Sequence, residues 1–183
     1  MGLDIVEFIM AVEVAFDVEI ADHDAAQIRT PRDLVTHLRG RLPPAPDGAP
    51  CLTQRAFYQT RRAIVRRFRR PRAALRPATA LAGAIPAAGR SEHWRALGND
   101  LAVEAWPRFP EPGWRTDVLG GPRTLGDLAR HLAIRNPAAV KSGAGWTDAE
   151  IVGVVTAFIE AEFGVDMSRF TLDSSFVEDM GVD

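Results

Sequence analysis

Residues 3–20 read LDIVEFIMAVEVAFDVEI, and this stretch determines the fold class that the sequence predicts. Its large apolar residues recur at intervals of three and four, at Ile5, Phe8, Ile9, Val12 and Phe16. That spacing places them on one face of an α-helix, with Asp4, Glu7 and Glu13 mostly outside that face. The stretch therefore predicts an amphipathic helix over residues 3–16.

Helical periodicity recurs along the chain, and no segment shows the sustained alternation that indicates a strand. Further helices are expected over residues 22–28, 31–42, 53–68, 91–103, 124–131 and 148–163, with one helical turn over 173–180. Thr30, Ser91, Thr124 and Thr147 are expected to cap helices, because a side-chain hydroxyl accepts a hydrogen bond from a free amide of the first turn. The sequence predicts an all-α protein.

Charge is sorted along the chain, which a net charge of −2 conceals. Residues 1–28 hold seven acids and no Lys or Arg, and residues 147–183 hold nine acids and one base, Arg169. Residues 53–135 hold sixteen arginines and six acids, a net charge of +10. The proline-rich stretch 43–52 and the stretch 136–146 are expected to be linkers between an acidic module and an arginine-rich module.

Composition excludes several classes of protein. A single cysteine, Cys51, rules out a disulfide framework and a cysteine-based zinc site. No run of 18 apolar residues suggests a membrane span, and the start of the chain lacks the basic region of a secretory signal, so we expect a cytoplasmic protein. No GxSxG, HExxH, P-loop or GxGxxG context occurs, so we expect neither an enzyme nor a metal centre.

An internal repeat indicates how the modules are assembled. RTPRDLVTHL at residues 29–38 and RTLGDLARHL at residues 123–132 share the pattern RTxxDLxxHL, 94 residues apart. At a shift of 95, Ile159 and Phe163 fall on Ile64 and Phe68. In the arginine-rich copy the helix 53–68 comes first, whereas its counterpart 148–163 follows the rest of the acidic copy. Residues 147–183 followed by residues 1–42 therefore form one acidic module whose helices come in the same order as those of the arginine-rich module.

In that order SFVEDMGVD, residues 175–183, leads into the helix that begins at Leu3. The joined module resembles an acyl carrier protein that is circularly permuted. The resemblance implies a small four-helix bundle made of residues 1–42 and 147–183. Residues 53–135 resemble a second, degenerate bundle of the same kind, inserted between the two halves.

The carrier family bears 4′-phosphopantetheine on the serine of an Asp-Ser-Leu pattern. Asp183 matches the aspartate and Leu3 the leucine, but Gly2 stands in the place of the serine. Glycine has no hydroxyl, so the chain as written is expected to carry no cofactor. 4′-Phosphopantetheine is expected only if the parent protein has a serine at this point. A degenerate carrier and a chain rearranged with loss of the serine remain two open explanations.

The resemblance implies a carrier or docking protein of fatty-acid or polyketide type acyl metabolism. Its expected partners are acyl-metabolism enzymes, recognised by acidic residues on or just after the helix that begins at Leu3, namely Asp4, Glu7, Glu13, Asp17 and Glu19. The alternative is a protein–protein interaction scaffold that keeps the carrier fold without the prosthetic group.

A basic patch on the helix 53–68 has several candidate partners. Arg55, Arg62, Arg66 and Arg69, called here the docking arginines, are expected to cluster on one face. They could dock on the acidic module of the same chain, where a tether raises the effective concentration. An external acidic partner, a membrane surface and a nucleic acid are the alternatives. A nucleic acid is disfavoured, because the chain is acidic overall and no aromatic stacking platform accompanies the arginines.

Overall fold

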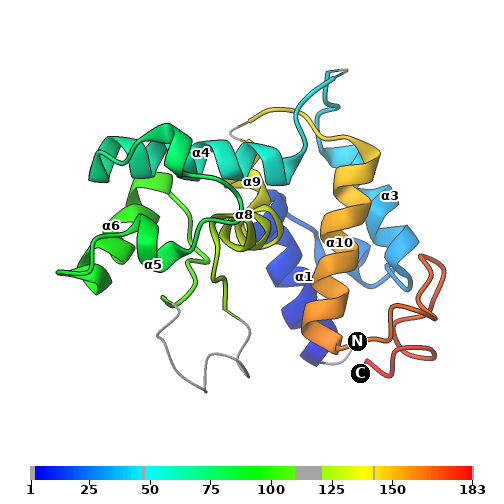
Figure 1. Cartoon of the computed structure of the whole chain (residues 1–183). Coiled ribbons are helices and arrows are strands. Elements are labelled where there is room, and N and C mark those ends of the chain that lie inside the picture. The colour runs from blue at the N-terminus through cyan, green and yellow to red at the C-terminus, as the bar shows by residue number, and fades with distance from the viewer. Residues whose placement is uncertain (1–2, 47, 110–120, 142, 183) are drawn as a thin grey trace. The chain divides into compact units, whose positions relative to one another are not determined.

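The computed structural model of the chain describes residues 3–46, 48–109, 121–141 and 143–182. Over these residues it contains helices and turns but no strand, which confirms the all-α prediction (Figure 1). The chain divides into two compact units, of which unit 1 is Met1–Ala49 with Gly143–Asp183 and unit 2 is Pro50–Ser142. Among the described helices, none combines the length and hydropathy that crossing a bilayer requires.

Unit 1 is built from helices at both ends of the chain. These are α1 (Leu3–Phe16), α2 (Asp22–Ala25), α3 (Pro31–Arg41) and α10 (Asp148–Phe163). Helix α10 contacts both α1 and α3, so the two ends of the chain share one core (Figure 1). Apolar side chains from three helices fill this core and are at most 4% exposed: Phe8, Val12, Leu34, Leu38, Val155 and Ile159.

Capping boxes begin the helices of the repeat in both units. The Thr30 hydroxyl accepts from the amide of Asp33 at 3.2 Å, and the Asp33 carboxylate accepts from the amide of Thr30 at 2.9 Å. Thr124 and Asp127 make the same two bonds at the start of α8 (Leu125–Arg135). Thr147 caps α10 in the same way, which confirms the three threonine predictions.

Ser91 is not a helix cap, and that prediction is wrong. Helix α6 (Arg90–Leu101) begins one residue earlier, and its N-cap is Gly89 with a φ of 68°. A left-handed backbone of this kind is easily adopted by glycine, so the turn forms at Gly89. Ser91 then lies inside the first helical turn.

Unit 2 packs around the long helix α4 (Leu52–Phe68), which contacts α6, α8 and α9 (Pro137–Lys141). The short elements η1 (Arg72–Ala74) and α5 (Leu81–Ala84) connect α4 to α6. Helix α9 lies in the stretch 136–146, whose proline and glycine content predicts a linker. Asn136 fixes the start of α9, because its side-chain amide accepts from the amide of Ala105 at 2.9 Å and donates to the Ala105 carbonyl at 3.0 Å.

After α10 the segment forms no named helix, but residues 175–181 make turns closed by hydrogen bonds between residues four apart, the spacing of the single helical turn expected over 173–180. The amide of Asp179 donates to the Ser175 carbonyl at 3.1 Å, and the amide of Gly181 donates to the Val177 carbonyl at 3.2 Å. Arg32 on α3 holds the start of the segment, because its Nη2 donates to Oδ2 of Asp173 at 2.8 Å. The hydrogen bond from Arg32, with its positive charge, lowers the pKa of Asp173.

The chain leaves and re-enters unit 1 at a paired segment that we call the neck, residues 43–45 and 145–146. The amide of Trp146 donates to the Pro43 carbonyl at 2.7 Å, and the amide of Ala45 donates to the Trp146 carbonyl at 2.9 Å. The Trp146 ring is 7% exposed and lies 4.7 Å from the ring of Phe16, centroid to centroid. The neck is therefore anchored in the core of unit 1.

Candidate functional site

The candidate site in unit 1 lies where the C-terminal segment meets the first two turns of α1. Phe176 is 1% exposed, and its ring centroid lies 5.5 Å from that of Phe8 on α1 and 6.4 Å from that of Phe163 on α10. The backbone amide of Phe176 donates to the Arg29 carbonyl at 3.1 Å, and the amide of Val182 donates to the Phe176 carbonyl at 2.9 Å. Segment 175–182 is thus fixed against the helix that begins at Leu3.

A pocket of about 320 Å³ opens beside this contact. Four buried apolar residues line it, from α1, from α2 and the loop after it, and from the C-terminal segment: Ile5, Ala25, Ile28 and Phe176. The exposed side chains of Arg29 and Glu178 also belong to the lining. Its volume lies at the lower end of the range of small-molecule pockets. An apolar wall with charged groups beside it suits a short apolar chain that ends in a polar group.

The residues expected at the attachment position lie at the two ends of the chain. Gly2 and Asp183 lie outside the described residues. The joined order of the module also predicts that Met1 and Asp183 are neighbours, and both of these residues lie outside the described residues as well. Leu3 is the first residue of α1. Ser175 is a hydroxyl residue in the lining of the pocket, and its Oγ accepts a hydrogen bond from the amide of Glu178 at 3.1 Å.

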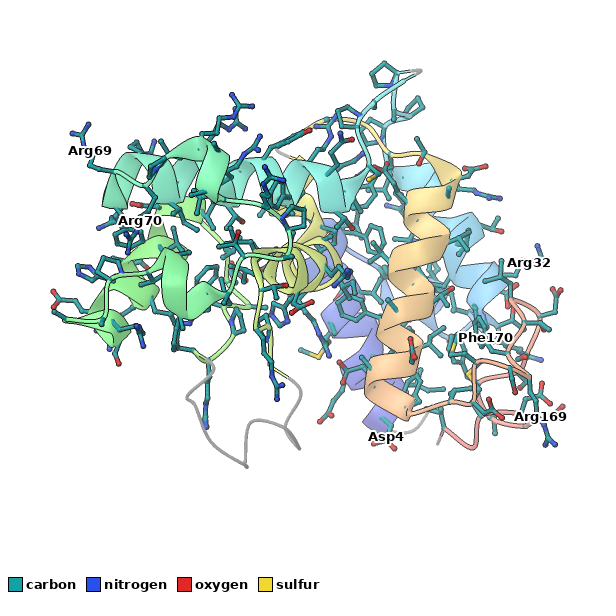
Figure 2. All side chains as sticks on the ribbon, viewed as in Figure 1. Asp4, Arg32, Arg69, Arg70, Arg169 and Phe170 are labelled. Atoms are coloured by element: carbon teal, nitrogen blue, oxygen red, sulfur yellow. The ribbon has the colours of Figure 1, made fainter. Side chains whose placement is uncertain are left out.

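The acidic residues expected to recognise partners do not all share one environment. Asp4, Glu7, Asp17 and Glu19 are exposed, and Figure 2 shows Asp4 at the first turn of α1, pointing outward. We call these four the acidic face. Glu13 is half-buried, and its Oε1 accepts from the amide of Ile20 at 2.6 Å. Glu13 therefore holds the chain that follows α1 as well as carrying charge.

Two apolar side chains belong to the exposed surface of α1, and the charge pattern does not reveal them. Met10 is 58% exposed and Val14 is 63% exposed. They follow Glu7 at helical spacing, so the carboxylate and the two apolar groups share one side of the helix. The sequence does give one signal for them, because both are apolar yet lie outside the apolar face of the helix predicted over residues 3–16. Such a mixed surface is typical of protein recognition sites.

The docking arginines of unit 2 are only partly brought together. Arg62 and Arg66 are exposed one turn apart on α4 and line the same hollow. Arg55 lies two turns earlier, and its Nε donates to the Pro50 carbonyl at 3.0 Å. Arg69 ends α4 with a φ of 55° and points away from the helix end (Figure 2). Arg61 and Arg72 also line the hollow and were not among the residues expected from the sequence.

The repeat also places a histidine near the end of a helix in each unit. In unit 2, Nε2 of His131 lies 3.3 Å from the Ala105 carbonyl oxygen, and burial lowers the pKa of His131. In unit 1, Nε2 of His37 is buried without a hydrogen-bond partner in the described structure. Within the described part of the chain, no three His, Cys, Asp or Glu side chains group in a way that could hold a metal ion.

Part of the chain is similar to acyl carrier proteins. It is 58% identical over 37 residues to the acyl carrier protein of Syntrophobacter fumaroxidans, which covers 20% of this chain and 46% of that protein. It is 50% identical over 37 residues to that of Bdellovibrio bacteriovorus and 46% identical over 42 residues to acyl carrier protein 2 of Pseudomonas aeruginosa. The chain spans about half the length of the curated relatives it matches. No family model and no solved structure matches it.

Proposed function

We propose that unit 1 is an acyl-carrier-like unit in permuted order and that it acts in acyl metabolism by docking on partner enzymes. The observation that carries the proposal is the packing of Phe176, near the end of the chain, on Phe8, near its beginning. This contact gives the last residues and α1 one shared core, as a carrier module in the order 147–183 then 1–42 requires. The similarity to acyl carrier proteins supports the same function.

The chain as written does not fit covalent attachment of 4′-phosphopantetheine between Asp183 and Leu3. Gly2 offers no hydroxyl there, and the Ser175 hydroxyl accepts from the Glu178 amide in the turn that begins at Ser175. The proposed role therefore rests on the recognition surface of α1, formed by the acidic face with Met10 and Val14. An interaction scaffold without a prosthetic group is the second candidate function, and the missing hydroxyl favours it.

A rearranged chain distinguishes the two functions. It joins residues 147–183 through one added serine to residues 3–42 and is incubated with coenzyme A and a phosphopantetheinyl transferase. We expect its intact mass to rise by one phosphopantetheinyl group, because the serine then follows Asp183 and precedes Leu3. The matched control carries alanine in place of the serine and should gain nothing. A folded serine version that gains no mass would contradict the carrier-like proposal and favour the scaffold.

We also propose that the acidic face of unit 1 docks on the docking arginines of unit 2. The acids of the acidic face lie at both ends of α1, a helix about 21 Å long, and the docking arginines extend along α4, a helix about 26 Å long. The two sets of opposite charge therefore extend over similar lengths. Tethering two such surfaces gives a millimolar effective concentration, so a weak electrostatic attraction suffices for docking.

The docking proposal predicts a salt-dependent change in the full-length chain. The NMR amide shifts of Glu7 and Val14 should move between about 20 and 500 mM salt, because screening weakens attraction between exposed charges. The double charge reversal Arg62→Glu/Arg66→Glu should abolish this movement. Arg130→Glu, which replaces an arginine already paired with Asp127 at 2.8 Å, is the control and should retain it. Equal movement in all three proteins would argue against docking.

A further inference from the structure

A hollow on unit 2 lies along α4 and has a volume of about 560 Å³. We call it the arginine hollow, and its lining residues are Tyr58, Arg61, Arg62, Val65, Arg66 and Arg72. All but the last lie on α4 at helical spacing, and Arg72 comes from η1 after the chain has turned at Arg69. The volume falls within the range of pockets that bind small molecules.

The four guanidinium groups of the arginine hollow form no direct ion pair within the described part of the chain, although Arg62 and Arg66 share a second hollow with Asp100. None of the residues that line the hollow is acidic, and none of its four arginines forms an ion pair with a described carboxylate. Arg67 on the same helix shows the opposite situation, because it binds both carboxylate oxygens of Asp100 at 2.6 and 2.7 Å. Asp100 is therefore paired with Arg67, whose hydrogen bond, with a smaller contribution from the charge of Arg66, lowers the pKa of Asp100.

Unneutralised arginines one turn apart repel one another. Like charges at positions i and i+4 of a helix, such as Arg62 and Arg66, destabilise that helix. An anion that contacts several of these groups removes the repulsion. Guanidinium groups bind phosphate through two parallel hydrogen bonds, so one polyphosphate can satisfy several arginines at once.

The hollow also offers an aromatic surface. Tyr58 is 40% exposed, and the Arg61 guanidinium lies 4.9 Å from the centre of its ring and 5.1 Å from that of Phe57. This contact fixes Arg61 beside the ring, with Val65 as a further apolar residue of the lining. An aromatic base can stack on such a ring while its phosphates reach the arginines.

We propose that the arginine hollow binds a small ligand that carries two or more linked phosphates, such as a nucleoside diphosphate or a free polyphosphate. Linked phosphates concentrate several negative charges within a few ångströms, as the compact group of four arginines requires. An acidic protein helix distributes its carboxylates more widely, since those of the acidic face lie at both ends of α1, which is about 21 Å long. This site does not depend on the acyl-carrier-like function proposed for unit 1, but it shares Arg62 and Arg66 with the docking arginines, so a bound polyphosphate would compete with the proposed docking.

The test is isothermal titration calorimetry of the full-length chain with ADP and with tripolyphosphate. Arg61→Gln/Arg72→Gln removes two charges from the hollow and none from the docking arginines. Arg55→Gln/Arg69→Gln removes two charges from the docking arginines and none from the hollow. We expect the first pair to weaken both probes about tenfold or more, since hydrogen bonds to charged groups are the strong ones. The second pair should weaken them less than about twofold.

Tyr58→Leu distinguishes the two sources of phosphate. It should weaken ADP about fivefold more than tripolyphosphate, because both probes lose the contact that fixes Arg61, whereas only ADP loses base stacking on the aromatic ring. An equal effect on both probes would exclude stacking and leave a polyphosphate site. An equal loss of affinity in the two double variants would overturn the proposal in favour of diffuse electrostatic attraction. The absence of binding to the unmodified chain would also overturn it. If a peptide of residues 3–20 displaced ADP at a concentration lower than that of the ADP, the proposal would be overturned in favour of an acidic protein as the ligand.

Discussion

Replacing Phe176 with alanine is expected to lower the free energy of unfolding of unit 1 by about 3–5 kcal/mol, as burial in an aromatic core implies. The side chain is 1% exposed and contacts the rings of Phe8 and Phe163, so its removal leaves a cavity that joins the neighbouring pocket. Small domains are stable by only about 5–15 kcal/mol, so this loss is a large part of the total. It should also release segment 175–182 from α1.

The measurement is a urea titration followed by the NMR amide signals of Leu34 and Ile159, which report on unit 1 alone. Val177→Ala is the matched control, because Val177 is adjacent and 59% exposed. It should change the free energy of unfolding by less than about 0.5 kcal/mol. A loss below about 1 kcal/mol for Phe176→Ala would contradict the shared core and with it the main support for the acyl-carrier-like function.

Replacing Gly145 with alanine is expected to destabilise unit 1 by about 2–4 kcal/mol, through overpacking and the loss of backbone hydrogen bonds. A Cβ atom at this position would lie 1.9 Å from the Pro44 carbonyl oxygen and 2.3 Å from its carbon. Backbone atoms cannot rotate away as a flexible side chain does, so the two hydrogen bonds of Trp146 must stretch or break. The buried Trp146 ring then loses its fixed position against Phe16.

The same urea titration checks this result, with hydrogen exchange of the Trp146 amide as a local measure of the neck. Gly153→Ala is the control, because Gly153 lies within α10 and has open space where a Cβ would be. That substitution should stabilise the unit by about 0.5–1 kcal/mol, since alanine favours a helix more than glycine does. An unchanged Trp146 exchange rate in Gly145→Ala would show that the neck tolerates the extra carbon.

Local chemistry made most helices predictable from the sequence. Thr30, Thr124 and Thr147 each precede an acidic residue by three positions, and the capping box depends on these neighbours alone. Ser91 has the right residue type, but the turn at Gly89 decides where α6 begins. Helix α9 was missed because its stability comes from contacts with distant residues, such as the bond from Gln59 Nε2 to the Val140 carbonyl at 3.0 Å.

The candidate surfaces were predictable in their charge but not in their geometry. The acids of α1 are visible in the sequence, whereas the exposure of Met10 and Val14 depends on which face α10 and the C-terminal segment cover. The run of arginines after residue 60 is equally visible. Its division into Arg67, which is paired with Asp100, and Arg72, which lines the hollow, depends on where α6 and η1 lie.

The neck also makes the stabilities of the two units depend on each other through chain entropy. Ala45 and Trp146 are joined by hydrogen bonding, so the roughly 100 residues between them form a closed loop. Closing a flexible loop of that length costs about 4 kcal/mol of conformational entropy, a cost that grows with the logarithm of the loop length. Folded unit 2 brings its first and last helices, α4 and α9, into contact, so most of this cost disappears. Unfolding unit 2 would restore the entropic cost of closing the loop and so destabilise the hydrogen bonds of the neck, even if the two units never touched.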